Sequence, residues 1–162
     1  MGYDPQIHRG RLERLRPEFY QGRAFVHWTM AIEDRATGWL DDLHHLRMRE
    51  WLCHVLARYQ LCCPTYCLMP DHVHFLWLGL TDQSDQRLAA GLFRKCWAAN
   101  LEPRGYRLQL QPYDHVLRER EREKGSFMTT ADYVLQNPVR TGLVGDWREY
   151  QYRGALVPGY PD

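Results

Sequence analysis

Hydrophobic and polar residues alternate in four short stretches of the chain, and such alternation is typical of β-strands, whose side chains point to opposite faces. The second and third of these stretches are connected only by Met69-Pro70-Asp71, which is too short for anything but a tight antiparallel turn. The predicted strands span residues 24–32, 61–69, 72–78 and 106–110.

Apolar residues at helical spacing predict three helices, over about residues 41–59, 84–100 and 127–136. Asp41 or Asp42 can cap the first helix. The third is expected to end at Gln136, because Pro138 disfavours helical geometry at the residue before it. In the first helix, His44 and His45 are interpreted as surface residues, and the apolar side is expected to include Leu43, Leu46, Trp51, Leu52, Val55 and Leu56.

The order strand, helix, strand, strand, helix, strand, helix predicts an α+β protein with helices packed on an antiparallel sheet. A chain of 162 residues fits a single domain over residues 1–162. Within it, residues 1–22 are predicted to form an irregular basic arm and residues 145–162 an irregular C-terminal tail. The charged run at 119–124 is expected to be a solvated helical turn or loop.

The composition, with 44% hydrophobic and 25% charged residues, is ordinary for a soluble protein. No apolar run is long enough to span a membrane, and residues 1–18 lack the apolar core of a signal peptide, so we expect a cytoplasmic protein. The five cysteines are expected to be reduced thiols, with Cys62-Cys63-x-x-x-Cys67 and nearby His54 as an alternative zinc site.

The net charge of +1 does not by itself indicate a nucleic-acid partner. However, Lys95 and Lys124 are the only lysines among the 21 basic residues, and the rest are arginines. Arginine can grip phosphate in bidentate fashion and stack on bases. Any binding surface must be a local patch rather than the whole molecule.

Two histidines lie two residues apart in the third predicted strand. His72 and His74 project from one face, whereas Val73, Phe75 and Trp77 point to the other and are expected in the core. Two imidazoles about 7 Å apart along one face can hold a divalent metal ion between them. The alternative is that both are histidines with ordinary structural hydrogen bonds.

The last predicted helix carries a second group of candidate residues. Tyr133 and Asn137 are four residues apart and lie on one helical face. A tyrosine hydroxyl can act as a nucleophile, and an amide oxygen one turn away can be a third metal ligand, with Gln136 as the alternative. The alternative, which spacing alone favours, is that Tyr133 packs on the sheet with Val134 and Leu135.

Together, Met69-Pro70-Asp71-His72-Val73-His74 and the segment that begins Tyr133-Val134-Leu135-Gln136-Asn137-Pro138 and runs to Val144 resemble the REP-associated tyrosine transposases. These belong to the single-tyrosine HUH superfamily, in which two histidines flank a hydrophobic residue. Residues 113–118 are similar to the segment between the two motifs, and the resemblance runs from about Phe25 to Val144.

The resemblance implies a ferredoxin-like α+β HUH domain in which Mg²⁺ or Mn²⁺ is bound by His72, His74 and a ligand from the tyrosine helix, Asn137 or Gln136. It implies that Tyr133 attacks single-stranded DNA to form a 5′-phosphotyrosine and release a 3′-OH, which can reverse the attack. The protein would then be a DNA strand-transferase that cleaves and rejoins strands in the nucleoid, and it would work as a monomer or a homodimer.

Members of this group recognise DNA hairpins formed by palindromic repeats. The basic arm from Arg9 to Arg23 is expected to contribute phosphate contacts, which weaken with salt. Two other classes of function remain open: a DNA-binding protein that keeps the fold without cutting, and a small zinc-binding or cupin-like metal protein. The other residues predicted to bind DNA are Arg87, Arg94, Lys95, Arg104 and Arg107.

Overall fold

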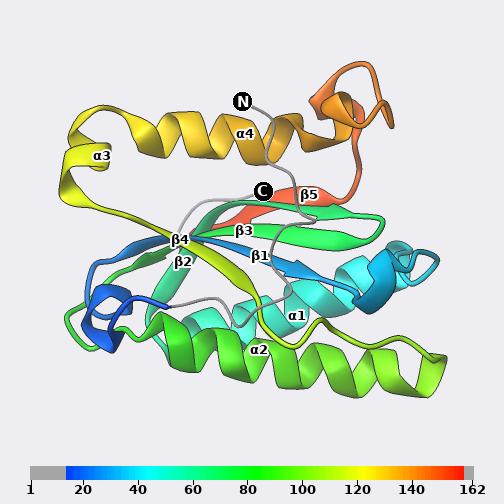
Figure 1. Ribbon diagram of the computed structural model, residues 1–162, viewed down its shortest axis with the longest axis horizontal. Helices are drawn as coiled ribbons and strands as arrows, with labels where there is room; N and C mark the ends of the chain where they lie inside the picture. The colour runs from blue at the N-terminus through cyan, green and yellow to red at the C-terminus, as the bar shows by residue number, and fades with distance from the viewer. Residues whose placement is uncertain (1–13, 159–162) are drawn as a thin grey trace.

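A five-stranded antiparallel sheet lies at the centre of the molecule, in a computed structural model that describes residues 14–158 (Figure 1). The strands follow the order β4-β1-β3-β2-β5 across the sheet. Most of the predicted basic arm, residues 1–13, lies outside the described residues. The strands are β1 (Phe25–Ala31), β2 (Leu61–Met69), β3 (His72–Gly79), β4 (Tyr113–Leu117) and β5 (Arg153–Leu156).

Helices α1 (Asp42–Arg58) and α2 (Gln86–Leu101) cover one face of the sheet, and α4 (Ser126–Arg140) crosses the other (Figure 1). The order β4-β1-β3-β2, with α1 after β1 and α2 after β3, is the ferredoxin-like arrangement. The predicted α+β class with a central antiparallel sheet is therefore confirmed. Shorter helical segments are η1 (Pro17–Tyr20), η2 (Glu33–Arg35), η3 (Glu102–Arg104), α3 (Glu119–Glu123) and η4 (Trp147–Glu149).

Alternation along β1 and β3 separates an apolar face from a polar one. The apolar side chains are buried against α1 and α2, where Trp28 lies 6.0 Å from Trp77 and Phe75 lies 5.1 Å from Phe93 of α2 between ring centroids. Burial of such large rings dominates the energy of a core. The opposite face of the same two strands turns polar side chains toward α4, among them His27, Thr29, His72 and His74.

Helix α4 continues through Pro138 to Arg140, so the prediction that it ends at Gln136 is wrong. Pro138 has no N–H to donate to the carbonyl of Val134. The side chain of Asn137 replaces that donor, because its Nδ2 lies 3.4 Å from the carbonyl oxygen of Val134 and 2.9 Å from that of Tyr133. The helix therefore tolerates the proline.

Two edge regions also differ from prediction. Residues 106–110 make only a single bridge, between Ile32 and Leu108, and the edge strand is β4 a few residues later. The tail expected to be irregular contributes β5, which pairs with β2 through Cys67 and Arg153. Both strands are short, and their positions are set by pairing with distant strands.

The buried face of α1 is rotated from the predicted one. Leu43 and Leu46 are 66% and 59% exposed, whereas His44 is buried. The indole of Trp97 donates a hydrogen bond to Nε2 of His44 (3.0 Å), and burial lowers the pKa of His44 to about 4. His44 was expected at the surface, and this expectation is wrong because a neutral imidazole can accept a hydrogen bond inside the core.

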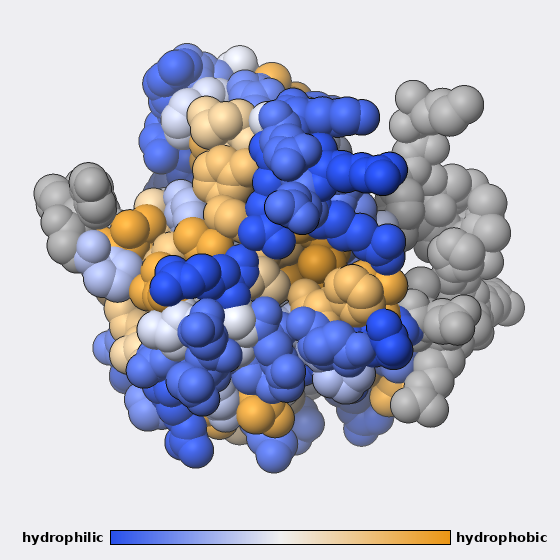
Figure 2. Space-filling model, turned by 90° about the vertical axis from the view of Figure 1, so that its left-hand side faces the viewer, coloured by the Kyte–Doolittle hydropathy of each residue, from blue (hydrophilic) through white to orange (hydrophobic). Residues whose placement is uncertain are grey.

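The charged run at 119–124 largely forms the short helix α3, within the predicted alternatives. Arg118 and Arg122 lie over the rings of Phe19 and Phe25, with guanidinium carbons 5.4 and 5.3 Å from the ring centroids. Figure 2 views this end of the molecule and shows hydrophilic side chains next to an apolar patch. None of the helices in the described part of the chain is long and apolar enough to cross a membrane.

All five cysteines are free thiols. Cys63 packs in the main core, whereas Cys67 packs in a smaller cluster with Met69, Val134 and Tyr150 beneath α4. A register shift between Cys62 and Thr65 separates the two positions along β2. The alternative zinc site is therefore not supported, because its thiols lie on opposite faces of the sheet.

We predict that Gly79→Ala lowers the free energy of unfolding by at least about 2 kcal/mol, because a Cβ there would overlap the backbone carbonyl of Gly22. Gly91→Ala is the matched control. It lies within α2 with open space around it, and should raise stability by about 0.5–1 kcal/mol. Urea denaturation measures both changes, and effects of the same sign would contradict the prediction.

Candidate active site

The two motif histidines converge on one point beneath α4. The Nε2 atoms of His72 and His74 are 3.0 Å apart, and both side chains are almost completely buried. Their ring planes are nearly perpendicular, with an interplanar angle of 88°. Strand alternation alone places both imidazoles on one face, and the rotamers turn their Nε2 atoms toward each other.

Asp71 and Arg35 support His72 from one side. Nδ1 of His72 lies 2.5 Å from a carboxylate oxygen of Asp71, whose other oxygen accepts from Nε of Arg35 at 2.7 Å. Although burial acts to raise it, the pKa of Asp71 is lowered by the hydrogen bond with His72 and by the charges of His72 and Arg35. The contact of Nδ1 with this carboxylate orients the imidazole and leaves Nε2 of His72 turned toward His74.

Arg35 reaches Asp71 from an unusual stretch of backbone. Asp34 and Arg35 both have left-handed φ angles, 56° and 55°. This conformation costs a non-glycine residue roughly 1–2 kcal/mol. Strained residues of this kind cluster at functional sites. The turn after β1 therefore stores strain while it places a guanidinium beside His72.

Strand β1 supports His74. In the antiparallel register Thr29 pairs with His74, and Oγ1 of Thr29 lies 3.1 Å from Nδ1 of His74. Nε2 of His27 lies at the same distance from that nitrogen. Burial and the nearby His115 lower the pKa of His27 to about 4, and burial also lowers the pKa of His74 well below its usual value. Both imidazoles are therefore neutral near pH 7.

Tyr133 projects from α4 over these imidazoles. Its ring centroid is 6.0 Å from those of His27 and His74, and its side chain is 41% exposed. The guanidinium carbon of Arg140 lies 4.3 Å from the centroid of the same ring. The structure thus brings the predicted nucleophile beside the predicted histidine pair, with one edge open to solvent.

Asn137 follows one helical turn after Tyr133 and is buried against the sheet. Its amide nitrogen is bonded to the helix backbone, which leaves Oδ1 as the acceptor that can turn to a ligand. Gln136 is half-buried and lies about 100° around the helix from Asn137. Both amides lie within one helical turn of Tyr133, and Asn137 is the one buried against the sheet.

The donor set fits a divalent ion. Two neighbouring ligands about 2.1 Å from one octahedral ion lie about 3 Å apart, which is the separation of the two Nε2 atoms. Within residues 14–158, no group of three or more His, Cys, Asp or Glu side chains is placed to hold a metal ion. A metal ion here would be held by two imidazoles and an amide oxygen such as that of Asn137.

The five residues predicted to bind DNA lie on or after α2, on the opposite face of the sheet from Tyr133. Arg94 donates to the carbonyl oxygens of Gln109 and Leu110, and Arg104 donates to that of Trp39, so both have structural bonds. Arg87, Lys95 and Arg107 are exposed. The structure does not bring these side chains to the tyrosine, and their role in DNA binding stays a prediction.

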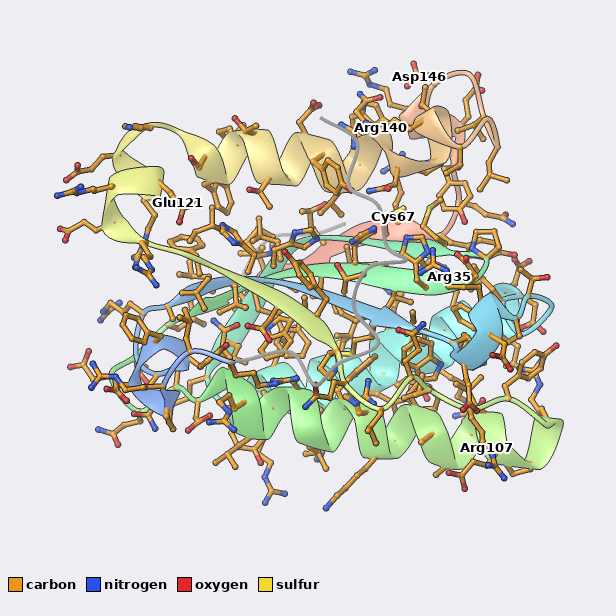
Figure 3. The ribbon with its side chains drawn as sticks, in the orientation of Figure 1. Arg35, Cys67, Arg107, Glu121, Arg140 and Asp146 are labelled. Atoms are coloured by element: carbon orange, nitrogen blue, oxygen red, sulfur yellow. The ribbon has the colours of Figure 1, made fainter. Side chains whose placement is uncertain are left out.

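Sequence reasoning missed His27, Thr29, Arg35 and Arg140 as parts of this site. Figure 3 shows Arg35 near the start of β3 and Arg140 on α4, whereas Arg107 lies near α2 on the other side of the sheet. The alternation of the first predicted strand placed His27 and Thr29 on one face, but the register that brings them to His74 comes from pairing between distant strands.

The fold is shared with a class of DNA-processing proteins, the tyrosine transposases. A solved structure of a REP-associated tyrosine transposase bound to a REP hairpin is similar over 88% of this chain and 82% of that one, with a TM-score of 0.74 and 17% sequence identity. No protein-family model and no curated protein matches the sequence. At this identity, the likeness establishes the fold.

We predict that His27 makes folding stability fall in mild acid. Its pKa is about 4 when folded and about 6.5 when unfolded, so the unfolded state binds more protons between these values, and stability decreases as the pH falls. From pH 8 to pH 5 the loss is about 2 kcal/mol, and His27→Gln should lack it.

Urea denaturation in EDTA at both pH values measures this loss. The exposed His54→Gln is the control and should behave like the wild type. A His27→Gln protein with the pH dependence of the wild type would contradict a neutral, buried His27.

Proposed function

We propose that this protein cleaves and rejoins single-stranded DNA at hairpin-forming sequences through a covalent bond to Tyr133, with a divalent metal ion bound at His72 and His74. The single observation that carries the proposal is the position of Tyr133 over His74, whose Nε2 atom lies 3.0 Å from that of His72. A nucleophile beside a pair of metal-type ligands is the arrangement that metal-assisted phosphoryl transfer needs.

In the proposed reaction, the phenol oxygen of Tyr133 gives up its proton and forms a bond to phosphorus. The bond from phosphorus to the 3′-oxygen breaks, and that oxygen leaves as a hydroxyl after taking up a proton. The product is a 5′-phosphotyrosine, which a 3′-OH can attack to restore a phosphodiester. One phosphate ester replaces another at each step, so no high-energy cofactor is required.

His72, His74 and Asn137, with Gln136 as the alternative amide, would hold Mg²⁺ or Mn²⁺. When bound, the ion would position the phosphate and stabilise negative charge on its oxygens. Asp71 and Thr29 keep the Nδ1 atoms of the two histidines occupied, so that both Nε2 atoms are available. Residues outside the ligand set thereby orient the ligands.

A hairpin partner is supported by the fold, because the similar solved structure has a REP hairpin bound. Arginines supply the phosphate contacts that dominate the affinity of proteins for DNA. Such a reaction would take place in the cytoplasm at the nucleoid, by a monomer or a homodimer. A hairpin-binding protein that does not cut is the second candidate, and it shares every feature except turnover at Tyr133.

We predict that the wild type forms a covalent adduct with a labelled hairpin oligonucleotide in Mn²⁺, detected on a denaturing gel. Tyr133→Phe should abolish the adduct and leave hairpin affinity within about twofold, because only the attacking oxygen is lost. Tyr59→Phe, on the other side of the sheet, is the control. Binding of hairpins from the surrounding genome without any adduct would favour the non-cutting protein.

We predict that Mn²⁺ binding, followed by the electron paramagnetic resonance signal of the free ion, weakens at least about 100-fold in His72→Ala and His74→Ala. His54→Ala should bind like the wild type. Asn137→Ala should weaken binding about tenfold and Gln136→Ala should leave it unchanged, because Asn137 is buried against the sheet that carries the histidines and Gln136 is only half-buried. The reverse order for the two amides would assign Gln136 as the ligand, and unchanged binding in the histidine variants would exclude the site.

A further inference from the structure

We propose that Arg140 binds the phosphate that Tyr133 attacks and holds the tyrosine ring in position for that attack. This inference rests on the proposed function, and it adds a residue that sequence analysis did not identify. It is carried by the geometry at the end of α4 and by the distribution of ion pairs around the site.

Arg140 is the last residue of α4, two helical turns after Tyr133. Its guanidinium carbon lies 4.3 Å from the centroid of the Tyr133 ring, well inside the distance of about 6 Å at which a cation is attracted to an aromatic face. Its Nη1 also donates to the backbone carbonyl of Tyr133 at 3.2 Å. Two contacts therefore tie the same guanidinium to one residue and restrict the motion of its ring.

In the described part of the chain, no neighbouring acid neutralises the charge of Arg140. Arg35, the other guanidinium at the site, forms an ion pair with Asp71 at 2.7 Å. Within residues 14–158, no carboxylate pairs with Arg140, and its hydrogen bond to Tyr133 uses only one of its N–H groups. The remaining donors lie beside the ring of the nucleophile, where they can bind two oxygens of a phosphate.

Arg140 is also close to the histidine pair. Its guanidinium carbon lies 4.3 Å from the centroid of the Tyr133 ring, and that centroid is 6.0 Å from the centroid of the His74 ring. A phosphate placed between Tyr133 and the imidazoles would therefore lie close to this guanidinium. As the bond to Tyr133 forms and the bond to the 3′-oxygen breaks, donors fixed at the non-bridging oxygens stabilise the charge there.

The first experiment compares Arg140→Gln and Arg140→Lys with the wild type in single-turnover adduct formation on a hairpin oligonucleotide. Removal of one preorganised donor typically slows a reaction about 100-fold, so we expect that loss for glutamine. Lysine keeps the charge without the planar fork and should lose about tenfold. Hairpin affinity should stay within about twofold. This measurement distinguishes a role in the reaction from a purely structural defect, which would lower binding and rate together.

Arg58→Gln is the matched control. Arg58 is also the last residue of a helix and also lies over a tyrosine, with its guanidinium carbon 5.7 Å from the ring of Tyr59. It belongs to α1, on the other face of the sheet, and its replacement should leave the rate of adduct formation unchanged. Adduct formation in Arg140→Gln at the wild-type rate would overturn the role of Arg140 and leave the proposed function intact.

The second experiment requires neither turnover nor a variant. Inorganic phosphate is titrated into the wild-type protein, and the Nε–Hε resonances of its arginines are followed by NMR. We expect a saturable shift of Arg140 and none of Arg58. If the wild type forms no adduct, DNA cleavage is excluded, and this titration still tests the phosphate site. A resonance of Arg140 that does not respond to phosphate would overturn the proposal that Arg140 binds phosphate.

Discussion

The antiparallel pairing of β1 with β3 is the constraint on which the candidate site depends, because it places Thr29 directly beside His74. On the other face of these strands, Trp28 and Trp77 are buried among the aromatic residues of the core. A slip of one residue would exchange the two faces and put imidazoles in the core. Burial of large rings against α1 and α2 therefore fixes the polar geometry beneath α4.

The parts of this arrangement that could be predicted are those with local signals. The alternation around His72 and His74, the short turn before them and the aspartate that caps α1 each depend on a few neighbouring residues, and each is confirmed. The ferredoxin-like order also followed from the resemblance. The burial of His44 could not be predicted, because its partner Trp97 comes from another helix. Strand β5 was missed for the same reason, since pairing with β2 defines it.

The end of α4 shows how a correct local rule can still mispredict an element. Proline does remove a backbone donor, but the side chain of Asn137 supplies a replacement to the carbonyl of Val134. The same side chain carries the oxygen proposed as the third metal ligand. An amide is suited to both tasks, because its nitrogen can hold the helix while its oxygen faces the site. Asn137 would thus link the geometry of the helix to that of the metal site.

Neutral imidazoles and charged guanidiniums surround the site. Burial keeps His27 and His74 neutral, which is the state in which an imidazole can coordinate a metal or accept a hydrogen bond. The positive charge at the site comes from the guanidiniums of Arg35 and Arg140. The residues predicted from the sequence to bind DNA lie on or after α2, whereas the arginines at the site come from a strained turn and a helix end. Such positions become recognisable as parts of one site only when the sheet brings them together.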